Sequence, residues 1–586
     1  MNFLRNLLAS IIGFFVAIFL IVLFFIAIGS AIGSAMGSGE KIVVEPNTVL
    51  ELDLALTIKD YAPKENNPLA DALDLPTENL GLNAVLNAIE NAKTDANIKG
   101  ISIKTLFVNA GMAQTQAIRN KLKDFKESGK LIYAYNDVYD QKNYYLSSVA
   151  DAVYLNPVGA IDFKGLSTEI LYFKDFEDKY GVKMEVIRHG KYKSAVEPYL
   201  TNKMSEANRE QTVSFLKSIW SEIITDISED RGMSIESLNA IADNAYGRDA
   251  TLALEHKLID AVIYEDEYET KLNESIDASE ASVISLEDYI ASGKGRIKAT
   301  SKDRIAVIYA QGQIMYGKGN EDIIGQGLIN EAIKKAVKDK KTKAIVLRVN
   351  SPGGSALASE LIWRELELAK KEKPLVVSMG NYAASGGYYI AAGADKIVAE
   401  PTTITGSIGV FGMLPNAYEF AKDIGINAEQ VSTNNNPDYS FFEPMDKRFY
   451  EVTKEGVEHI YDTFVSRVAA GREMSTTAVN EIAQGRVWTG KEAKEVGLVD
   501  ELGGLQEAIN IAADLAEIGD YRIRNYPNYK KDFKDSFGVF PFAKVDKEAI
   551  IKETLGDEEY RLYKRINDMK NLKGIQARMP YVFTVK

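Results

Sequence analysis

The sequence predicts an α/β fold with mostly parallel strands, and it predicts that this fold occurs twice in the chain. Short apolar runs alternate with amphipathic helical patterns, as in strands that are joined by crossover helices. The chain also matches itself without a gap over a long stretch, at the offset that separates Gln141 from Ser385 (385 − 141 = 244). A chain of 586 residues is too long for one hydrophobic core. We therefore expect a tandem duplication.

The N-terminal segment has the pattern of a transmembrane helix. Leu7–Ile32 contains no charged residue and exceeds the ~20 residues that cross a hydrocarbon core. Arg5 precedes this run and the next basic residue is Lys41, so the positive-inside rule places the N-terminus in the cytoplasm and the body outside. A cleaved signal peptide is the alternative, because Gly29–Gly39 is rich in small residues. We assign residues 1–45 to a cytoplasmic stub and this helix.

The rest of the chain divides into two copies and a tail. We assign 46–300 to the first copy and 301–545 to the second, with a Ser-, Gly- and Lys-containing linker at 291–303. About a dozen additional residues of the first copy fall in the polar stretch 61–79. The charged pattern of the final part predicts a helical tail over 546–586.

The second copy shows the alternation of strands and helices clearly. The apolar runs Ala344–Val349 and Leu375–Met379 predict strands, and a helix is expected to begin at Ser385. Between them, Ser355–Lys370 predicts an amphipathic helix. The apolar residues that share one half of its helical wheel are Leu357, Leu361, Ile362, Leu366 and Leu368.

The composition excludes several classes of function. The chain is 46% hydrophobic and 26% charged, as in globular proteins. Its net charge of −14 argues against a nucleic-acid partner, because such binding depends on Lys and Arg. Cysteine is absent, which excludes disulfides, thiolate metal sites and cysteine nucleophiles. With three histidines (His189, His256 and His459) we expect no metal or other cofactor, and a Ser-His-Asp triad has few candidates.

Two turns rich in small residues mark a candidate active site. Val349–Ser355 joins a strand to a helix through Gly353-Gly354, and Ser385 is followed by Gly386-Gly387 at the next such junction. Backbone N–H groups at helix starts can stabilise a tetrahedral oxyanion. Each motif alone is usually an ordinary turn or helix cap. Together in one α/β unit they favour a serine nucleophile that faces an oxyanion hole. The first copy has Asn109-Ala110 at the first of these turns.

The two copies divide the reactive residue types between them. Gln141 stands in the first copy where the second has Ser385. The first copy instead has the basic segment Gly190–Ser194, which matches Asn434–Asp438 in the second, a stretch without lysine. A lysine acts as a base when its pKa moves from ~10.4 toward 7, which costs about 4 kcal/mol and is within the reach of burial. Small and apolar residues follow Lys193, which makes it the candidate base of a site built across both copies.

Four blocks of the chain resemble the signal peptide peptidase A (protease IV) family in its long, duplicated bacterial form. These blocks are Gly190–Pro198, Asn350–Ser355, Ala383–Tyr389 and Thr405–Gly409. The resemblance implies a tandem duplication of a Clp protease/crotonase-like domain, preceded by one transmembrane helix. It also implies a homo-oligomer (a tetramer) in the inner membrane, with the catalytic domains on the periplasmic or extracytoplasmic side.

The resemblance assigns a role to five residues. Ser385 is implied as the nucleophile and Lys193 as the general base, and Ser407 orients the lysine by a hydrogen bond. The oxyanion hole is implied to consist of the N–H groups of Gly354 and Gly386.

The function expected from these features is that of a membrane-anchored serine endopeptidase with a Ser/Lys dyad. Its expected substrates are cleaved signal peptides and other short apolar peptides, and residues 7–32 are expected to contact membrane lipid. We expect the peptide to enter a groove beside Gly406, Ile408, Gly409 and Val410, because glycines there leave the backbone open to an added strand.

Two other functions are alternatives to a peptidase. A crotonase-like acyl-CoA enzyme would share the paired-glycine oxyanion hole, but it needs neither a nucleophilic serine nor a buried lysine. An anchor that faces outward would also separate such an enzyme from CoA. An inactive membrane scaffold predicts the loss of Ser385 or Lys193, and both residues are present.

Overall fold

The computed structural model describes residues 42–62, 79–276, 281–294, 301–435, 438–529 and 576–579, together with seven positions between 13 and 24. Most of the predicted membrane segment Leu7–Ile32 therefore lies outside the described residues, as do most of the insertion at 61–79 and of the tail at 546–586. Within the described part of the chain, no helix is both long enough and apolar enough to cross a membrane.

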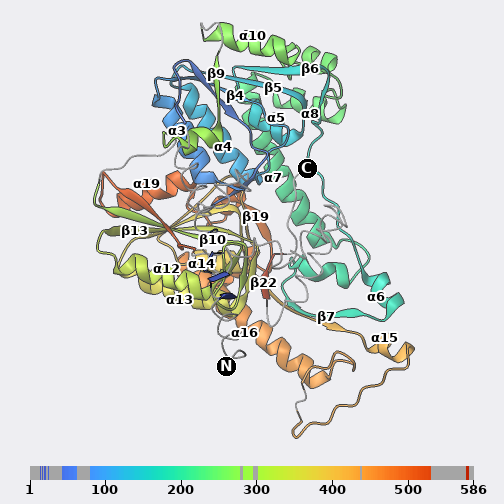
Figure 1. Ribbon diagram of the computed structural model, residues 1–586. Helices are drawn as coiled ribbons and strands as arrows, with labels where there is room; N and C mark the ends of the chain where they lie inside the picture. The colour runs from blue at the N-terminus through green and yellow to red at the C-terminus, as the bar shows by residue number, and fades with distance from the viewer. Residues whose placement is uncertain are drawn as a thin grey trace, which may run out of the picture.

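The first copy forms a parallel sheet with helices packed against it (Figure 1). The sheet has six strands, and each strand runs parallel to its neighbours. A strand from the end of this copy forms one edge of the sheet. The order is β8 (Ala261–Val262), β6 (Ala152–Ile161), β5 (Leu131–Tyr139), β4 (Ile98–Ile103), β1 (Thr48–Leu52) and β9 (Ser282–Ser285).

The second copy repeats this strand order. Its sheet runs β19 (Val487–Thr489), β17 (Ile404–Gly406), β15 (Leu375–Ala384), β13 (Thr342–Ser351), β10 (Arg304–Gln311) and β21 (Arg522–Tyr526), while β16 (Lys396–Ala399) joins β15 to β20 (Glu501–Leu502). The strands predicted at 344–349 and 375–379 lie inside β13 and β15. Because β10, β13, β15 and β21 occupy the places of β1, β4, β5 and β9, the predicted duplication is visible in the topology.

Matching side-chain contacts support the same equivalence. In the first copy, the hydroxyl of Tyr144 donates a hydrogen bond to the carbonyl of Leu258 over 2.8 Å. In the second copy, Tyr388 donates to Leu498, also over 2.8 Å. Both tyrosines are fully buried, so the same buried hydrogen bond occurs at corresponding positions of the two copies.

Helices cover the sheets of both copies. In the first copy these are α3 (Leu82–Thr94), α4 (Met112–Lys126), α5 (Gln141–Ser147), α7 (Glu206–Arg231), α8 (Ile235–Asp243), α9 (Ala250–Glu255), α10 (Glu265–Ser275) and α11 (Leu286–Ala291). In the second they are α12 (Gln326–Lys338), α13 (Ala356–Lys370), α14 (Gly386–Ala391), α16 (Lys447–Gly471), α17 (Thr476–Ile482), α18 (Gly490–Glu495) and α19 (Leu505–Leu515). Short strands β2 (Thr57–Lys59) and β3 (Asn79–Gly81) pair with each other.

Helix α13 was correctly predicted as a helix, but its buried face differs from the expected one. It begins where the hydroxyl of Ser355 accepts a hydrogen bond from the N–H of Ala358, at 3.3 Å. Leu357, Leu361 and Leu368 are exposed. The residues that pack inward are Ala356, Ala358, Ser359, Ile362, Trp363, Leu366 and Ala369.

A third, mixed sheet joins the two copies. Its order is β12 (Ile323–Gly325), β11 (Gln313–Met315), β14 (Gly353–Ser355), β22 (Gln576–Arg578), β18 (Val410–Asn416) and β7 (Lys183–His189). Strand β7 comes from the first copy and runs antiparallel to β18 of the second, from Val410 opposite His189 to Asn416 opposite Lys183. The first copy thus extends an arm onto the second.

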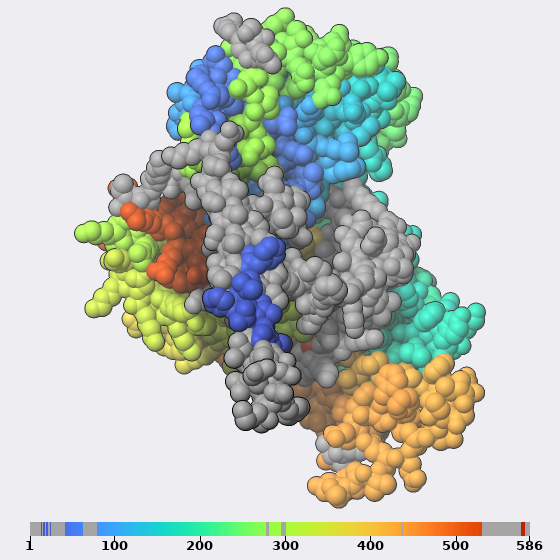
Figure 2. Space-filling model, viewed as in Figure 1, coloured from blue at the N-terminus to red at the C-terminus, as the bar shows by residue number. Residues whose placement is uncertain are grey.

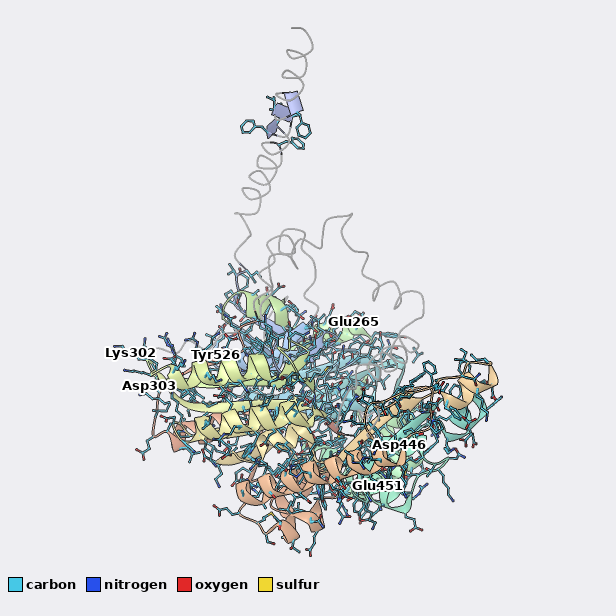
Figure 3. All side chains as sticks on the ribbon, turned by 90° about the horizontal axis from the view of Figure 1, so that it is seen from below. Glu265, Lys302, Asp303, Asp446, Glu451 and Tyr526 are labelled. Carbon is cyan, nitrogen blue, oxygen red and sulfur yellow. The ribbon has the colours of Figure 1, made fainter. Side chains whose placement is uncertain are left out.

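This arm consists of β7 together with α6 (Lys174–Tyr180), and it lies beside α15 (Tyr418–Asp423) of the second copy (Figure 1). The space-filling view shows both segments protruding from the body at its lower side (Figure 2). Helix α16 leads back from this region. Its first turn is capped by Asp446, whose carboxylate accepts a hydrogen bond from Phe449, and Figure 3 shows Asp446 and Glu451 at this end of the helix. The arm brings first-copy residues to the second copy's strand ends.

Candidate active site

Ser385 lies at the sharp junction between β15 and α14. Its backbone has φ 54° and ψ −114°, a conformation that non-glycine residues rarely adopt. Its N–H donates to the carbonyl of Gly406 over 2.8 Å, and its own carbonyl accepts from Tyr389 at 2.8 Å. A side chain at Gly387 would place its Cβ 2.8 Å from the carbonyl oxygen of Ser351, so only glycine fits there. These contacts hold the hydroxyl of Ser385 in one place.

Three predicted residues meet at the amine of Lys193. The Nζ of Lys193 lies 2.9 Å from the Oγ of Ser385 and 3.0 Å from the Oγ of Ser407. It also lies 3.2 Å from the carbonyl oxygen of Ser407. All three residues have no solvent exposure. The structure therefore brings a first-copy lysine into contact with two second-copy serines.

The surroundings of Lys193 favour its neutral form. Burial lowers the pKa of Lys193 well below its usual value, because the charged ammonium loses its hydration. Within the described part of the chain, no carboxylate forms an ion pair with this amine to oppose the shift. The lysine therefore meets the electrostatic requirement for a base.

The second copy fixes the backbone of Lys193. A turn at Gln484-Gly485 lies directly against it: the N–H of Tyr192 donates to the carbonyl of Gln484 over 2.9 Å. Gly485 has φ +84°, and a Cβ at this position would lie 2.7 Å from the Cα of Lys193. The N–H of Gly485 donates in turn to the carbonyl of Ile408. Sequence reasoning missed Gly485, and the Gln-Gly pair before a strand was its only local signal.

Gln211 is a second residue that the sequence analysis missed. It lies on α7 and is buried, and its amide donates to the Oγ of Ser194 over 2.9 Å and to the carbonyl of Tyr192 over 3.1 Å. Its carbonyl accepts from the N–H of Val487 at 3.2 Å. One side chain thereby ties the lysine segment to the second copy. A buried glutamine on an otherwise ordinary helix gives no pattern that would reveal this role.

The two glycine turns predicted from the sequence also meet in space. Gly353 and Gly354 have φ +97° and +154°, and a Cβ on Gly354 would lie 1.9 Å from the carbonyl oxygen of Ile314. A Cβ on Gly386 would lie 3.2 Å from the nitrogen of Gly354, so the backbones of these two residues are close neighbours. The hydroxyl of Ser351 accepts from the N–H of Gly353 at 3.1 Å and fixes the turn. This arrangement places backbone N–H groups beside Ser385.

The matching position in the first copy holds no hydroxyl. The buried side chain of Gln141 accepts hydrogen bonds from the N–H groups of Lys164 and Gly165, at 3.1 Å and 2.9 Å. Its amide donates to the carbonyl of Gly165 over 3.1 Å. Lys142 donates to the carbonyl of Ala110, the residue that matches Gly354. The side chains of Gln141 and Lys142 thus occupy the part of the first copy that corresponds to the candidate active site of the second copy.

The groove at Gly406–Val410 was predicted from an open backbone, and the structure contradicts that reason. Gly406 pairs on one side with Ala384 and on the other with Val487, so it presents no open strand edge. A Cβ at Gly409 would lie 2.8 Å from Gly485 and 3.2 Å from the Cδ of Lys193. These glycines allow close approach of neighbouring chains. Strand β18, which begins at Val410, pairs with β7 on one side and with β22 on the other.

His189, the other candidate base, occupies a different environment. It lies in β7 opposite Val410, and its ring stacks on Tyr461 with the ring centroids 3.9 Å apart. The side chain that contacts the Oγ of Ser385 is that of Lys193.

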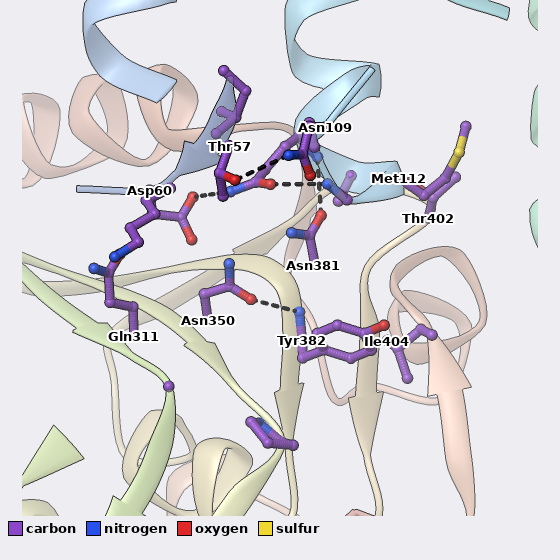
Figure 4. A pocket seen from close by; sticks show the side chains of 18 of the residues that line it. Thr57, Asp60, Asn109, Met112, Gln311, Asn350, Asn381, Tyr382, Thr402 and Ile404 are labelled. Atoms are coloured by element: carbon purple, nitrogen blue, oxygen red, sulfur yellow. Dashed lines mark hydrogen bonds between the residues drawn. The ribbon is translucent and has the colours of Figure 1, made fainter. Parts of the chain in front are cut away.

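A cavity of about 560 Å³ lies between the two copies (Figure 4). Asn109 and Met112 line it from the first copy, and Asn350 and Tyr382 line it from the second. Pro352, the residue before the glycine turn, lies on its wall. Ser385, Lys193 and Ser407 are not among the residues that line this cavity.

Comparison with known families gives the class of the protein. The family model described as "Peptidase family S49" matches residues 124–279 and 367–519, one stretch in each copy. The family model described as "Clp protease" matches residues 296–436. The chain is a serine-type peptidase with a duplicated, Clp protease-like α/β domain. It belongs to peptidase family S49, as the four sequence blocks predicted.

Its curated relatives agree with this assignment. The chain is 38% identical over 444 residues to Protease 4 of Haemophilus influenzae, covering 74% of this chain and 72% of the relative. It is also 38% identical over 455 residues to Protease 4 of Salmonella typhi, covering 75% and 73%. Serine protease SPPA, chloroplastic, of Arabidopsis thaliana is 34% identical over 438 residues, covering 73% and 64%.

Proposed function

We propose that the chain is a membrane-anchored endopeptidase that uses Ser385 and Lys193 as a catalytic dyad. The observation that carries this proposal is the 2.9 Å contact between the buried amine of Lys193 and the hydroxyl of Ser385. A neutral amine at this distance is within reach of the serine proton. Lys193 has the lowered pKa that such a base requires.

The proposed reaction has two steps. Lys193 takes the proton of Ser385 as Oγ attacks the scissile carbonyl, and the N–H groups of Gly354 and Gly386 stabilise the oxyanion. The protonated lysine then gives its proton to the leaving amine, which releases one product and leaves an acyl-enzyme. Water, activated by the same lysine, hydrolyses the ester and restores Ser385.

Ser407 is proposed to orient the base. Its hydroxyl and its carbonyl lie 3.0 Å and 3.2 Å from the Nζ of Lys193. In the neutral amine these two oxygens accept both protons, which leaves the nitrogen lone pair directed at the hydroxyl of Ser385.

The proposed substrates are released signal peptides and other short apolar peptides. The uncharged run Leu7–Ile32 supports an anchor in the same membrane in which such peptides remain, and Arg5 supports a site on the extracytoplasmic side. Strand β18 pairs with β7 along its whole length, and on its other side the described residues of β22 pair with it at Phe411. The rest of that side supports recognition of an extended peptide by strand addition. An acyl-CoA enzyme, the alternative, would give no role to the contact between serine and lysine.

The test uses a fluorophosphonate probe, which labels activated serines, followed by peptide mapping. We expect the label on Ser385 and its loss in Ser385→Ala, together with hydrolysis of an apolar peptide. Ser237→Ala is the matched control, because it removes an exposed hydroxyl of the first copy. Labelling of another serine in the Ser385→Ala variant would falsify the assignment.

A further inference from the structure

The cavity between the two copies contains an amine that no carboxylate compensates. The charged side chains in its lining are those of Lys59, Asp60, Lys142 and Asp322. Lys59 pairs with Asp322 at 2.8 Å, and Asp60 pairs with the buried Arg348 at 2.9 Å. Within the described part of the chain, Lys142 takes part in no ion pair. The lining therefore has one basic group in excess, which favours an anionic occupant.

Lys142 also has unused hydrogen-bonding capacity. Its Nζ donates to the carbonyl of Ala110 over 2.7 Å, which uses one of the three protons of an ammonium. Burial lowers the pKa of Lys142, because the charged amine loses hydration, and the nearby charge of Asp140 opposes this shift only in part. An anionic oxygen bound at this amine compensates for the lost water and favours its charged form.

Two carboxamides of the second copy supply further donors. The oxygen of Asn350 accepts from the N–H of Tyr382 at 3.2 Å, and that of Asn381 accepts from the N–H of Gln114 at 3.1 Å. Among the described residues, no acceptor is hydrogen-bonded to either NH2 group. Both side chains line the cavity (Figure 4). Because backbone N–H groups fix the two oxygens, the NH2 groups are left to donate to an occupant.

The place of Lys142 in the repeat corresponds to the proposed oxyanion hole. At the repeat offset, Ala110 matches Gly354 and Lys142 matches Gly386. The second copy thus has a glycine where the proposed reaction forms a transient negative charge, whereas the first copy has a lysine. A lysine side chain suits a permanent negative charge. The first-copy counterpart of the active site is therefore suited to bind an anion rather than to generate one.

The remainder of the cavity suits the end of an apolar peptide. A volume of about 560 Å³ is in the range of ligand-binding pockets. Apolar wall is contributed by Met112, Ile219, Pro352 and Ile404. An apolar lining with a few convergent donors is typical of sites that bind a small ligand in one orientation.

The cavity wall is connected to the turn at Ser385 by two strands. Tyr382 and Ile404, which line the cavity, are paired in β15 and β17. Two residues farther along the same strands, Ala384 pairs with Gly406, whose carbonyl accepts from the N–H of Ser385. At ~3.3 Å per residue this separation is about 7 Å. An extended peptide of a few residues spans that distance.

We propose that this cavity binds the free C-terminal carboxylate of a peptide substrate through Lys142, Asn350 and Asn381. This inference rests on the proposed function and adds a specificity to it. A signal peptide has no such carboxylate while it is joined to its protein, and it gains one when that bond is hydrolysed. Recognition of this group selects released peptides over precursors that are still intact.

The first test measures binding without turnover. In a Ser385→Ala background, polarisation gives the affinity of the full chain for a fluorescently labelled apolar peptide that ends in a free acid or in an amide. We expect the acid to bind about tenfold more tightly. Lys142→Gln, which keeps a donor for Ala110, is expected to remove this difference. Equal affinities of the two peptides overturn the proposal, as does a preference for the acid that persists in Lys142→Gln.

The matched control for this variant is Lys164→Gln. It removes another first-copy ammonium, but the side chain of Lys164 is 60% exposed and pairs with Asp162. The preference for the acid is expected to stay at about tenfold in this control. If the control loses the preference as Lys142→Gln does, the effect is one of overall charge and the proposed site is wrong.

A second variant tests the amide donors. Asn381→Asp retains an oxygen for the N–H of Gln114 but replaces the NH2 group by a negatively charged oxygen. We expect it to weaken binding of the acid about tenfold more than binding of the amide. Asn244→Asp, at an exposed residue of the first copy, is the control and is expected to affect both peptides equally. Equal weakening of the two peptides by Asn381→Asp contradicts a carboxylate at this position.

Steady-state hydrolysis separates this proposal from the proposed chemistry. With Ser385 present, we expect the acid to have a KM about tenfold lower than the amide at the same kcat, because the carboxylate contact is the same in the ground and transition states. If neither peptide is hydrolysed but the Ser385→Ala chain still prefers the acid, the catalytic assignment fails and the carboxylate site stands. If both are hydrolysed with equal KM and bound with equal affinity, the carboxylate site is wrong in an active peptidase.

Discussion

Lys193 is a buried amine whose pKa is lowered by burial rather than by a charged neighbour. The exclusion of water is therefore what favours the neutral amine at this site. In its proposed role as the base, Lys193 is prepared for proton transfer by the exclusion of water, and residues of both copies exclude it. Anything that admits water to Lys193 also raises its pKa and weakens the base.

We predict that the rate of peptide hydrolysis rises with pH through the lowered pKa of Lys193 and then levels off, since the neutral amine is the reactive form. Lys193→Arg is expected to be as inactive as Lys193→Met, because a guanidinium does not deprotonate in this range. A pH–rate profile of kcat/KM measures this. Retained activity in the arginine variant would point to another base.

The same lysine makes stability depend on pH. Between the lowered pKa of the folded state and the ~10.4 of the unfolded chain, only the unfolded state binds the proton. Stability therefore rises with pH in this window, by ~1.4 kcal/mol per pH unit. Lys193→Met is expected to remove this slope, which thermal unfolding at several pH values would show.

At the scale of elements, the site depends on how the first-copy arm lies against the turn at Gln484-Gly485. We predict that Gly485→Ala lowers kcat by about 10²-fold, because its Cβ would lie 2.7 Å from the Cα of Lys193 and displace the base. Gly497→Ala is the matched control. Its φ of +80° is close to the +84° of Gly485, but the nearest atom to its Cβ would be the Met474 sulfur, 3.9 Å away.

Both variants carry the same backbone strain, so a difference in kcat isolates the collision with Lys193. Circular dichroism and thermal unfolding check that both variants fold. If Gly497→Ala loses as much activity as Gly485→Ala, the effect is one of strain and the positional role of Gly485 is wrong.

Several elements could be predicted from the sequence because their signals are local. The apolar runs at 344–349 and 375–379 were predicted as strands, and they lie inside β13 and β15. The face of α13 was not predicted, because Leu357 and Leu361 are apolar yet exposed, while Ala358 and Trp363 pack inward. Periodicity marks an apolar side but cannot weigh a small buried alanine against an exposed leucine.

The contacts between copies could not be predicted in this way. Ser385 and Lys193 were found from motifs and family resemblance, but their 192-residue separation is bridged by the pairing of β7 with β18. Gly485 acts through the space it leaves empty. Strand β22 has three residues, Gln576, Ala577 and Arg578, within a tail expected to be helical, and no alternation marks so short a strand.

At the scale of the whole molecule, a buried ion pair joins the copies. Asp60 of the first copy and Arg348 of the second lie 2.9 Å apart, and each side chain is 1% exposed. We predict that Asp60→Ala lowers the free energy of unfolding by about 3–5 kcal/mol, since it leaves the guanidinium of Arg348 buried without its partner. Chemical denaturation of the full chain measures this.

A neighbouring exposed pair provides the control. Lys59 and Asp322 also join the copies, at 2.8 Å, but the side chain of Asp322 is 71% exposed. Asp322→Ala is expected to cost about 1 kcal/mol or less. If both variants lower the free energy of unfolding equally, burial of the Asp60–Arg348 pair adds nothing to the stability of the contact between the copies.

The division of the dyad between the copies has a consequence for the time during which the protein is being made. Lys193 leaves the ribosome 192 residues before Ser385, which at 5–20 residues per second is roughly 10–40 s. During this interval the wall that Gly409 and Gly485 form around the amine does not yet exist, so the lysine is hydrated, charged and unable to act as a base. In the proposed mechanism, proteolytic competence therefore arrives only with the second copy, and the nascent first copy cannot cleave its neighbours.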